Sequence, residues 1–219
     1  IAIVAGFQGF SFENGDTTTL GRGGSDTTAV ALAAALDASM CEIYSDVDGI
    51  YTADPRIVPR AHKLAQIDID SMLELSSSGA KILYIRAVEF ARRHQVPMRV
   101  RSSFSTDPGT LIYTAKSGDD MEEPIVSGVA TDDTQSKVTV IGLPDRPGKA
   151  AEVFQIVSEA GANIDMIVQN VSTTESKLSD ISMTLPHSDR HKVVQALKDH
   201  QAEVGFASVT YDDEVGKLS

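Results

Sequence analysis

A glycine-rich stretch between a hairpin signal and an alanine-rich run places the strongest constraint on the fold of this chain. Residues 17–28 read Thr-Thr-Thr-Leu-Gly-Arg-Gly-Gly-Ser-Asp-Thr-Thr, and residues 29–38 follow as a helix-like run. The backbone can turn sharply and approach a ligand at Gly21, Gly23 and Gly24, because no Cβ bars positive φ or close contact there. The stretch therefore predicts a cradle at a helix N-terminus.

The side chains around this turn suit an anion. Ser25 or Asp26 can cap the helix, whose unpaired N–H groups and positive dipole end attract negative charge. Arg22 offers a planar guanidinium that grips a carboxylate or phosphate with two hydrogen bonds. A glycine-rich loop before a helix is often only a tight turn, so both interpretations stay open on these residues alone.

Two later stretches point to a charged ligand as well. Residues 44–56 read Tyr-Ser-Asp-Val-Asp-Gly-Ile-Tyr-Thr-Ala-Asp-Pro-Arg and follow a short strand pattern. Ligands gather at the carboxyl ends of parallel strands, so we favour Asp46 for the site and interpret Asp48 as solvated turn chemistry. Lys81, in the first turn of a helix predicted over 80–94, is unfavourably placed unless negative charge lies there. A solvated surface lysine is the alternative.

In order and spacing, Thr-Leu-Gly-Arg-Gly-Gly-Ser-Asp, Ser-Asp-Val-Asp-Gly-Ile-Tyr-Thr-Ala-Asp-Pro-Arg and Gly-Ala-Lys resemble the motifs of the aspartokinases, within the amino-acid kinase superfamily. The resemblance covers nearly the whole chain, since it continues into a regulatory module beyond residue 120. It implies transfer of the γ-phosphoryl group of ATP to L-aspartate, giving 4-phospho-L-aspartate at the head of lysine, threonine and methionine synthesis. It also implies Mg²⁺ held mainly through the nucleotide phosphates, with no protein metal ligand.

The resemblance assigns roles to single residues. Arg22 would hold the substrate carboxylate, Asp26 would orient the substrate amine or cap the helix, and Lys81 would neutralise phosphate charge. The implied substrate site consists of Arg22, Gly23, Gly24 and Ser25. The implied ATP site consists of Ser45, Asp46, Tyr51, Thr52, Ala53, Asp54, Pro55, Arg56 and Lys81. Had its motif stood alone, Arg56 would be interpreted as part of a surface ion pair.

We expect the C-terminal portion of an amino-acid kinase domain at residues 1–113, as an α/β fold with a parallel-rich sheet and helices on both faces. The hydrophobic patterns predict a buried strand at 1–5, a hairpin around Asn14 and Gly15, a helix at 27–38 and a strand at 41–44. A short helix capped by Asp68 or Asp70, the helix at 80–94, a strand at 97–103 and a short strand near 112 follow. The polar, acidic segment 114–124 is the expected linker.

A ferredoxin-like ACT domain with the order βαββαβ is predicted at residues 125–219, which would also hold the start of a second module. Its expected elements are strands at 137–143, 163–171, 178–185 and 203–211, with helices at 148–160 and 188–200. A further strand is a candidate at 125–131.

The loop after the first of these strands could bind an amino acid. Asp145 can accept an ammonium group, and the N–H groups after Pro147 can take a carboxylate. The ACT resemblance implies lysine or threonine as feedback effectors, bound between modules of a homo-oligomer or hetero-oligomer. The residues it implies are Asp145, Gly148, Lys149, Ala150, Asn163, Ile164, Asp165 and Gln169. Pro-Gly is also good turn chemistry without a ligand, and Asn163 can simply start its strand.

The net charge and the cysteine content limit the kinds of partner and the cellular setting that we expect for this chain. The net charge of −12 argues against a nucleic-acid or anionic-membrane surface. The one cysteine, Cys41, stands at the start of an apolar strand and is interpreted as a core residue, which fits a reducing, cytoplasmic setting. The chain opens inside an apolar pattern at Ile1, and the family's N-terminal phosphate-binding strand and loop has no match here. We therefore expect upstream residues and a fragment that is incomplete for catalysis.

Two rival functions stay open. One is a different amino-acid kinase, acting on glutamate or acetylglutamate, which the ACT-like half disfavours. The other is a non-catalytic regulatory subunit that binds lysine or threonine. The missing N-terminal loop favours this second rival, whereas the motifs at Arg22, Asp46 and Lys81 would be pointless in it.

Overall fold

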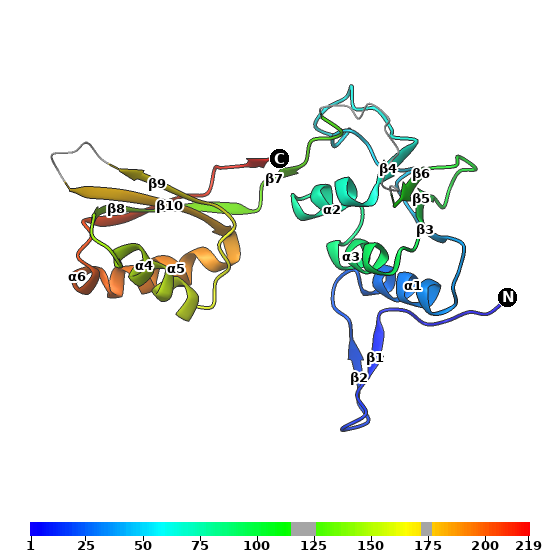
Figure 1. The fold of residues 1–219 in the computed structure, drawn as a ribbon, viewed down its shortest axis with the longest axis horizontal. Helices are drawn as coiled ribbons and strands as arrows, with labels where there is room; N and C mark the ends of the chain where they lie inside the picture. The colour runs from blue at the N-terminus through cyan, green and yellow to red at the C-terminus, as the bar shows by residue number, and fades with distance from the viewer. Residues whose placement is uncertain (115–125, 172–176) are drawn as a thin grey trace. The chain divides into compact units, whose positions relative to one another are not determined.

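The structure, a computed structural model, describes residues 1–114, 126–171 and 177–219. Two compact units make up the chain: residues 1–131 with 218–219 form unit 1, and residues 132–217 form unit 2 (Figure 1). Apart from Thr114, the linker expected at 114–124 lies outside the described residues. Residues 126–130, which the sequence places with the second domain, belong to unit 1, where the Val129 N–H donates to the Thr52 carbonyl at 2.7 Å.

Unit 1 is built on a four-stranded sheet with the order β3-β5-β6-β4. Strands β3 and β5 are parallel, as are β4 and β6, whereas β5 and β6 are antiparallel. The strands are β3 (Cys41–Ser45), β4 (Gln66–Asp68), β5 (Met98–Ser102) and β6 (Thr110–Tyr113). Because two of the three neighbouring pairs are parallel, the expected parallel-rich α/β sheet is confirmed.

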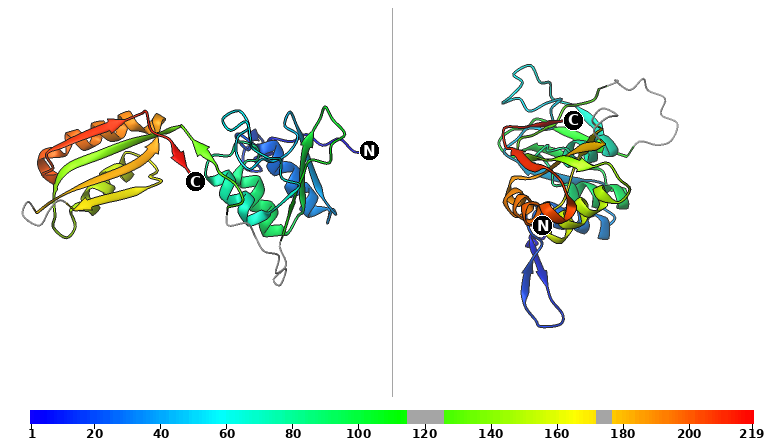
Figure 2. Two further views of the ribbon diagram at one scale, coloured as in Figure 1. Left: turned by 90° about the horizontal axis from the view of Figure 1, so that it is seen from above. Right: turned by 90° about the vertical axis from the view of Figure 1, so that its left-hand side faces the viewer.

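Three helices lie together beside this sheet (Figures 1 and 2). They are α1 (Gly24–Ala35), α2 (Ile69–Ser77) and α3 (Ile85–His94). Their buried side chains form one core with the sheet residues Met98, Val100 and Ile112. The intervening Arg99 and Arg101 are partly exposed and lie 3.8 and 3.5 Å from the Glu42 carboxylate. In the described part of unit 1 the helices thus cover one face of the sheet, while the other face carries Glu42, Arg99 and Arg101 together with Tyr44 and Leu111.

Local chemistry explains where two of these helices begin. Asp68 caps α2, because its carboxylate accepts from the N–H groups of Asp70 at 3.0 Å and Ser71 at 2.9 Å. Helix α3 begins at Ile85, five residues later than the sequence predicts. Tyr84 is extended, with φ −74° and ψ 133°, and Lys81 lies in the preceding loop. The placement of Lys81 in a helical first turn was therefore wrong.

The N-terminal segment departs from the expected strand. Residues 1–5 have no regular structure, and Ile1, Ile3 and Val4 are exposed, because none of the described strands pairs with them. The hairpin that follows forms as predicted from β1 (Gln8–Phe10) and β2 (Thr17–Thr19), with Gln8 opposite Thr19.

Unit 2 is an antiparallel sheet with the order β11-β8-β10-β9, covered on one face by helices (Figures 1 and 2). Its elements are β8 (Gln135–Pro144), α4 (Lys149–Glu159), β9 (Ile167–Val171), β10 (Leu178–Pro186), α5 (His187–Asp199), α6 (Gln201–Val204) and β11 (Ser208–Asp212). This confirms the βαββαβ order. Strand β9 begins four residues later than predicted, because the Asp165 N–H bonds to the Thr184 carbonyl at 3.0 Å in a loop.

Two short strands carry the chain into and out of unit 2. Strand β7 (Thr131–Asp132) pairs with β12 (Lys217–Leu218), and Ala130 exchanges two backbone hydrogen bonds with Ser219. Among the described residues, no helix combines the length and apolar character that a membrane span requires.

Candidate functional site

The glycine turn is fixed by its own backbone. Gly21 and Gly23 have φ values of 78° and 73°, and the Gly24 N–H bonds to the Gly21 carbonyl at 3.0 Å. Gly23 is the N-cap of α1, without a side-chain hydrogen bond, so the expected capping by Ser25 or Asp26 was wrong. A left-handed glycine turns the chain into the helix directly, which places both side chains in the first turn.

This turn packs against the segment that follows Lys81. A Cβ at Gly23 would lie 2.0 Å from Cγ of Tyr84, so only glycine fits there. Arg86 Nη1 donates a hydrogen bond of 2.9 Å to the Leu20 carbonyl. The first motif and the segment after the third are therefore in direct contact, while Arg22 stays exposed beside them.

Asp26 is half-buried in the first turn of α1. Burial raises the pKa of its carboxyl, and a hydrogen bond with the Ser25 side chain partly offsets that rise. A desolvated carboxylate is costly until a cation approaches. A nearby cation would therefore stabilise the charged form of Asp26.

The second motif begins where β3 ends. The Ser45 hydroxyl donates to Asp46 at 3.0 Å and accepts from the Val47 N–H at 3.3 Å. Asp48 is not the solvated turn residue expected, because its carboxylate accepts from the Tyr51 hydroxyl at 3.0 Å. Its second partner is the Lys63 ammonium group at 3.2 Å. These hydrogen bonds and the Lys63 charge outweigh the effect of burial and lower the pKa of Asp48.

Arg56 and Asp54 form a two-pronged ion pair. Arg56 Nε and Nη2 lie 3.0 and 2.7 Å from the Asp54 carboxylate oxygens, and the Arg56 side chain is 82% exposed. The surface ion pair left open for Arg56 is therefore present. Hydrogen bonds from the Arg56 side chain and backbone lower the pKa of Asp54, with smaller contributions from the charges of Arg56 and Lys81.

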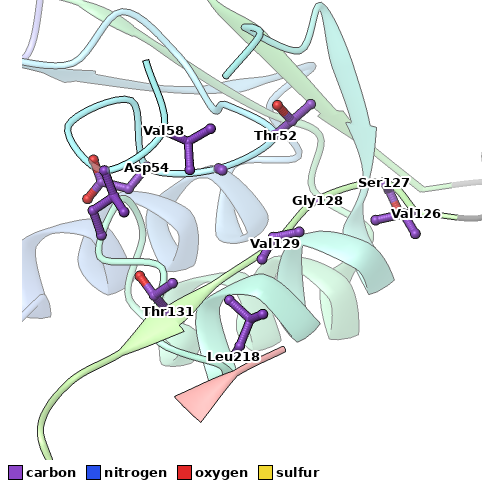
Figure 3. A pocket seen from close by; sticks show the side chains of 11 residues that line it. Thr52, Asp54, Val58, Val126, Ser127, Gly128, Val129, Thr131 and Leu218 are labelled. Carbon is purple, nitrogen blue, oxygen red and sulfur yellow. The ribbon is translucent and has the colours of Figure 1, made fainter. Parts of the chain in front are cut away.

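A cavity of about 360 Å³ borders one side of this motif (Figure 3). Its lining includes Thr52, Ala53 and Asp54 together with apolar side chains such as Val58, Val129 and Leu218, all within unit 1. The lining does not include Arg22, Asp46 or Lys81. Of the charged residues in the second motif, the lining therefore includes Asp54 but not Asp46.

The expected effector residues fall at two ends of unit 2. The Asp145 N–H bonds to the Lys177 carbonyl at 2.9 Å where β8 ends and β10 begins, and Gly148, Lys149 and Ala150 follow at the start of α4. Asn163, Ile164 and Asp165 lie at the opposite end, where Asp165 pairs with Lys217 at 2.7 Å. The two ends are roughly 20 Å apart, because six steps of about 3.3 Å along β10 separate Leu178 from Thr184. Gln169 lies between them on the edge strand β9.

Two further features are relevant to this site: the side chains that could bind a metal and the thiol of Cys41. Within the described ranges, no group of three or more His, Cys, Asp or Glu side chains could hold a metal ion. Cys41 is 6% exposed, and burial followed by the charge of Asp26 raises the pKa of its thiol. The buried position agrees with its interpretation as a core residue.

Three residues that contribute to the site went unnoticed in the sequence. Tyr84 and Arg86 contact the glycine turn, and neither belongs to a motif that the sequence singled out. Lys63 carries no motif signal, because its partners Asp48 and Asp107 are far away along the chain.

Comparison with known proteins decides the family. The amino acid kinase family model matches residues 1–102, and the ACT domain model matches residues 137–202. The aspartokinase of Corynebacterium efficiens is 58% identical over all 219 residues. The chain belongs to the aspartokinase family. This aspartokinase chain spans about half the length of the curated relatives it matches, 52% in that case.

Solved aspartokinase structures share the fold of this aspartokinase chain. E. coli aspartokinase III in complex with aspartate and ADP (R-state) is 31% identical, with a TM-score of 0.73 over 97% of this chain and 46% of that one. The same enzyme in complex with lysine and aspartate (T-state) is 32% identical, with a TM-score of 0.70 and the same coverage. The family identified from the motifs is thus confirmed.

Proposed function

We propose that the complete protein transfers the γ-phosphoryl group of ATP to the β-carboxylate of L-aspartate, giving 4-phospho-L-aspartate and ADP. One observation supports this most strongly. The glycine turn contacts Tyr84 and Arg86, which follow Lys81 closely in the chain, so the first motif and the segment after the third motif are neighbours in the fold. Contact between two segments far apart in sequence supports a shared site for two anionic substrates. The E. coli relative binds aspartate and ADP.

Positioning and charge neutralisation supply most of the catalysis in phosphoryl transfer. Arg22 would bind the substrate carboxylate, with Gly23, Gly24 and Ser25 lining its site, and half-buried Asp26 would receive the substrate ammonium group. Lys81 would neutralise phosphate charge, and Mg²⁺ would be held mainly by the nucleotide phosphates and water. The implied nucleotide residues are Ser45, Asp46, Tyr51, Thr52, Ala53, Asp54, Pro55 and Arg56.

The proposed mode of regulation is based on the separation of the expected effector residues into two groups at opposite ends of unit 2. A single amino acid is too small to contact both Asp145 and Asp165 across roughly 20 Å of sheet. We therefore propose two separate effector sites for lysine or threonine, each completed by another module in a homo-oligomer or hetero-oligomer. The E. coli T-state structure contains lysine. The cytoplasm is the proposed location, because the reaction consumes ATP and needs no disulfide.

The central test is formation of an acyl phosphate. Complete protein is incubated with aspartate, ATP and Mg²⁺; ADP is measured, and the acyl phosphate is trapped with hydroxylamine. Lys81→Ala and Arg22→Ala should each lower kcat/KM by about 100-fold. The matched surface variants Lys198→Ala and Arg93→Ala should keep activity. Full activity in Lys81→Ala and Arg22→Ala would remove the assignment.

Two further measurements address the rival functions. Activity with glutamate or acetylglutamate in place of aspartate would identify a different amino-acid kinase. Binding of lysine or threonine without any binding of MgATP in calorimetry would identify a regulatory subunit.

A further inference from the structure

Lys63 joins the nucleotide motif to a distant loop of unit 1. Its ammonium nitrogen lies 3.2 Å from Asp48 Oδ2 and 3.0 Å from Asp107 Oδ2. Asp48 lies within the second motif, between the implied nucleotide residues Asp46 and Tyr51, whereas Asp107 lies in the loop between β5 and β6. One cation thus lies between two carboxylates that would otherwise repel each other.

The backbone around Lys63 pairs with the nucleotide motif. Tyr51 and Lys63 form an antiparallel bridge, the Leu64 N–H donates to the Ile50 carbonyl at 2.8 Å, and Thr52 N–H donates to the His62 carbonyl at 2.9 Å. The fully buried Thr110 hydroxyl ties both segments to β6. It accepts from the Ile50 N–H at 2.8 Å and donates to the Leu64 carbonyl at 2.6 Å.

This arrangement determines what Tyr51 can offer a ligand. Its hydroxyl donates to both oxygens of Asp48, at 3.0 and 3.2 Å, and Lys63 donates to the same carboxylate. The bond to Asp48 raises the pKa of Tyr51, while bonds to Asp107 and Asp48 raise the pKa of Lys63. The phenol oxygen is therefore already engaged, and the ring is the part of Tyr51 left for packing.

We propose that Lys63 is a positioning residue for the nucleotide: it neutralises Asp48 and Asp107 and so holds Tyr51 with its ring, not its hydroxyl, available to the nucleoside. The inference rests on the proposed kinase function. Without Lys63, the carboxylates of Asp48 and Asp107 would lose their shared cation beside the segment proposed to receive a polyanion. The pairs are partly exposed, with 28% of the Lys63 side chain accessible, so solvent screens the effect to a moderate size.

Steady-state kinetics of the complete enzyme test this role. Lys63→Met removes the charge and keeps the length, and should raise KM for MgATP roughly 3- to 10-fold, equivalent to about 1 kcal/mol. The values of kcat and of KM for aspartate should change less than about twofold. Lys63→Arg should restore KM for MgATP, and Asp107→Asn added to Lys63→Met should restore part of it. Lys192→Met, which breaks a comparable pair with Asp189 in unit 2, is the matched control.

Hydrogen exchange in the nucleotide-free enzyme supplies a second readout. The amides of Thr52 and Leu64 should exchange faster in Lys63→Met and return to wild-type rates in Lys63→Arg. Faster exchange with unchanged KM for MgATP would overturn the proposal, as would equal losses for both substrates. A wild-type enzyme that binds no MgATP would instead overturn the proposed function and this inference with it. The two failures are distinguishable, because loss of the proposed function is measured with the wild-type enzyme alone, whereas failure of the Lys63 role is measured only with the Lys63 variants.

Discussion

Arg86 on α3 donates a hydrogen bond of 2.9 Å from Nη1 to the carbonyl oxygen of Leu20, the residue before the glycine turn. The contact reaches across 66 residues of sequence and uses one arginine to support the turn. A second arginine, Arg22, stays exposed at the turn itself. Support of the turn and the proposed grip on the substrate are therefore assigned to different side chains.

Removing this support should affect aspartate more than ATP. Arg86→Met deletes one exposed hydrogen bond to a carbonyl, so the free energy of unfolding should fall by only about 0.5–1.5 kcal/mol. KM for aspartate should rise roughly 3- to 10-fold, since a shift of the turn misplaces Arg22. Steady-state kinetics and urea unfolding measure both effects. Arg93→Met on the same helix should change neither, and an unchanged KM in Arg86→Met would contradict the supporting role.

Gly23 should be far less tolerant of a side chain than Gly15. Both residues have positive φ, 73° and 75°, so alanine costs about 1–2 kcal/mol at either position. At Gly15 nothing lies within 4 Å of the new Cβ, whereas at Gly23 the Cβ would meet the Tyr84 ring. Gly23→Ala should therefore lose about 1–3 kcal/mol more in urea unfolding. Adding Tyr84→Ala should shrink that extra loss, and equal losses for the two single variants would be inconsistent with the close packing.

Asp26→Asn should separate stability from activity. The pKa of Asp26 is raised from 3.8 in the folded protein, so the cost in stability is absent below that pH, grows between the unfolded and folded pKa values, and is complete above the folded pKa. Asparagine carries no such cost. The variant should be more stable than wild type at neutral pH, with the difference shrinking toward pH 4, while aspartate turnover is largely lost. Urea unfolding at several pH values measures this, and a difference independent of pH would refute the burial argument.

Ser136 should contribute more to unit 2 than an ordinary serine. It is fully buried on β8; its Oγ donates to Asp213 at 2.5 Å and lies 2.7 Å from His187 Nδ1. Ser136→Ala would leave two polar groups without this partner and should lower the free energy of unfolding by about 1–3 kcal/mol. Ser182→Ala, which removes one partly exposed bond to Thr139, should cost less. The reverse order in thermal or urea unfolding would contradict this assignment.

Most of the fold could be predicted from helix-capping residues and from the periodic pattern of hydrophobic residues. Asp68 caps α2 because a short carboxylate before a helix finds two free N–H groups within reach, a property readable from a few residues. The βαββαβ order of unit 2 could also be predicted from local sequence, because hydrophobic residues recur with different periods in strands and in amphipathic helices. The motifs at Arg22, Asp46 and Lys81 identified the family.

The remaining features depend on contacts between distant residues. Lys81 lies in a loop because Tyr84 is held against Gly23, which no helical propensity reveals. Residues 1–5 have a strand pattern, but a strand also needs a neighbour to bond with, and none of the described strands provides one. Lys63 has partners 15 and 44 residues away, so its part in the candidate site emerges only from the fold.

The pairing of β7 with β12 brings the two crossings into residues 132–217 side by side. A segment whose two ends are neighbours can be deleted and the flanking chain joined by a short turn. It can also be replaced by another domain whose ends lie equally close together. Recombination of this segment would change the regulatory unit while leaving the sheet of unit 1 unchanged.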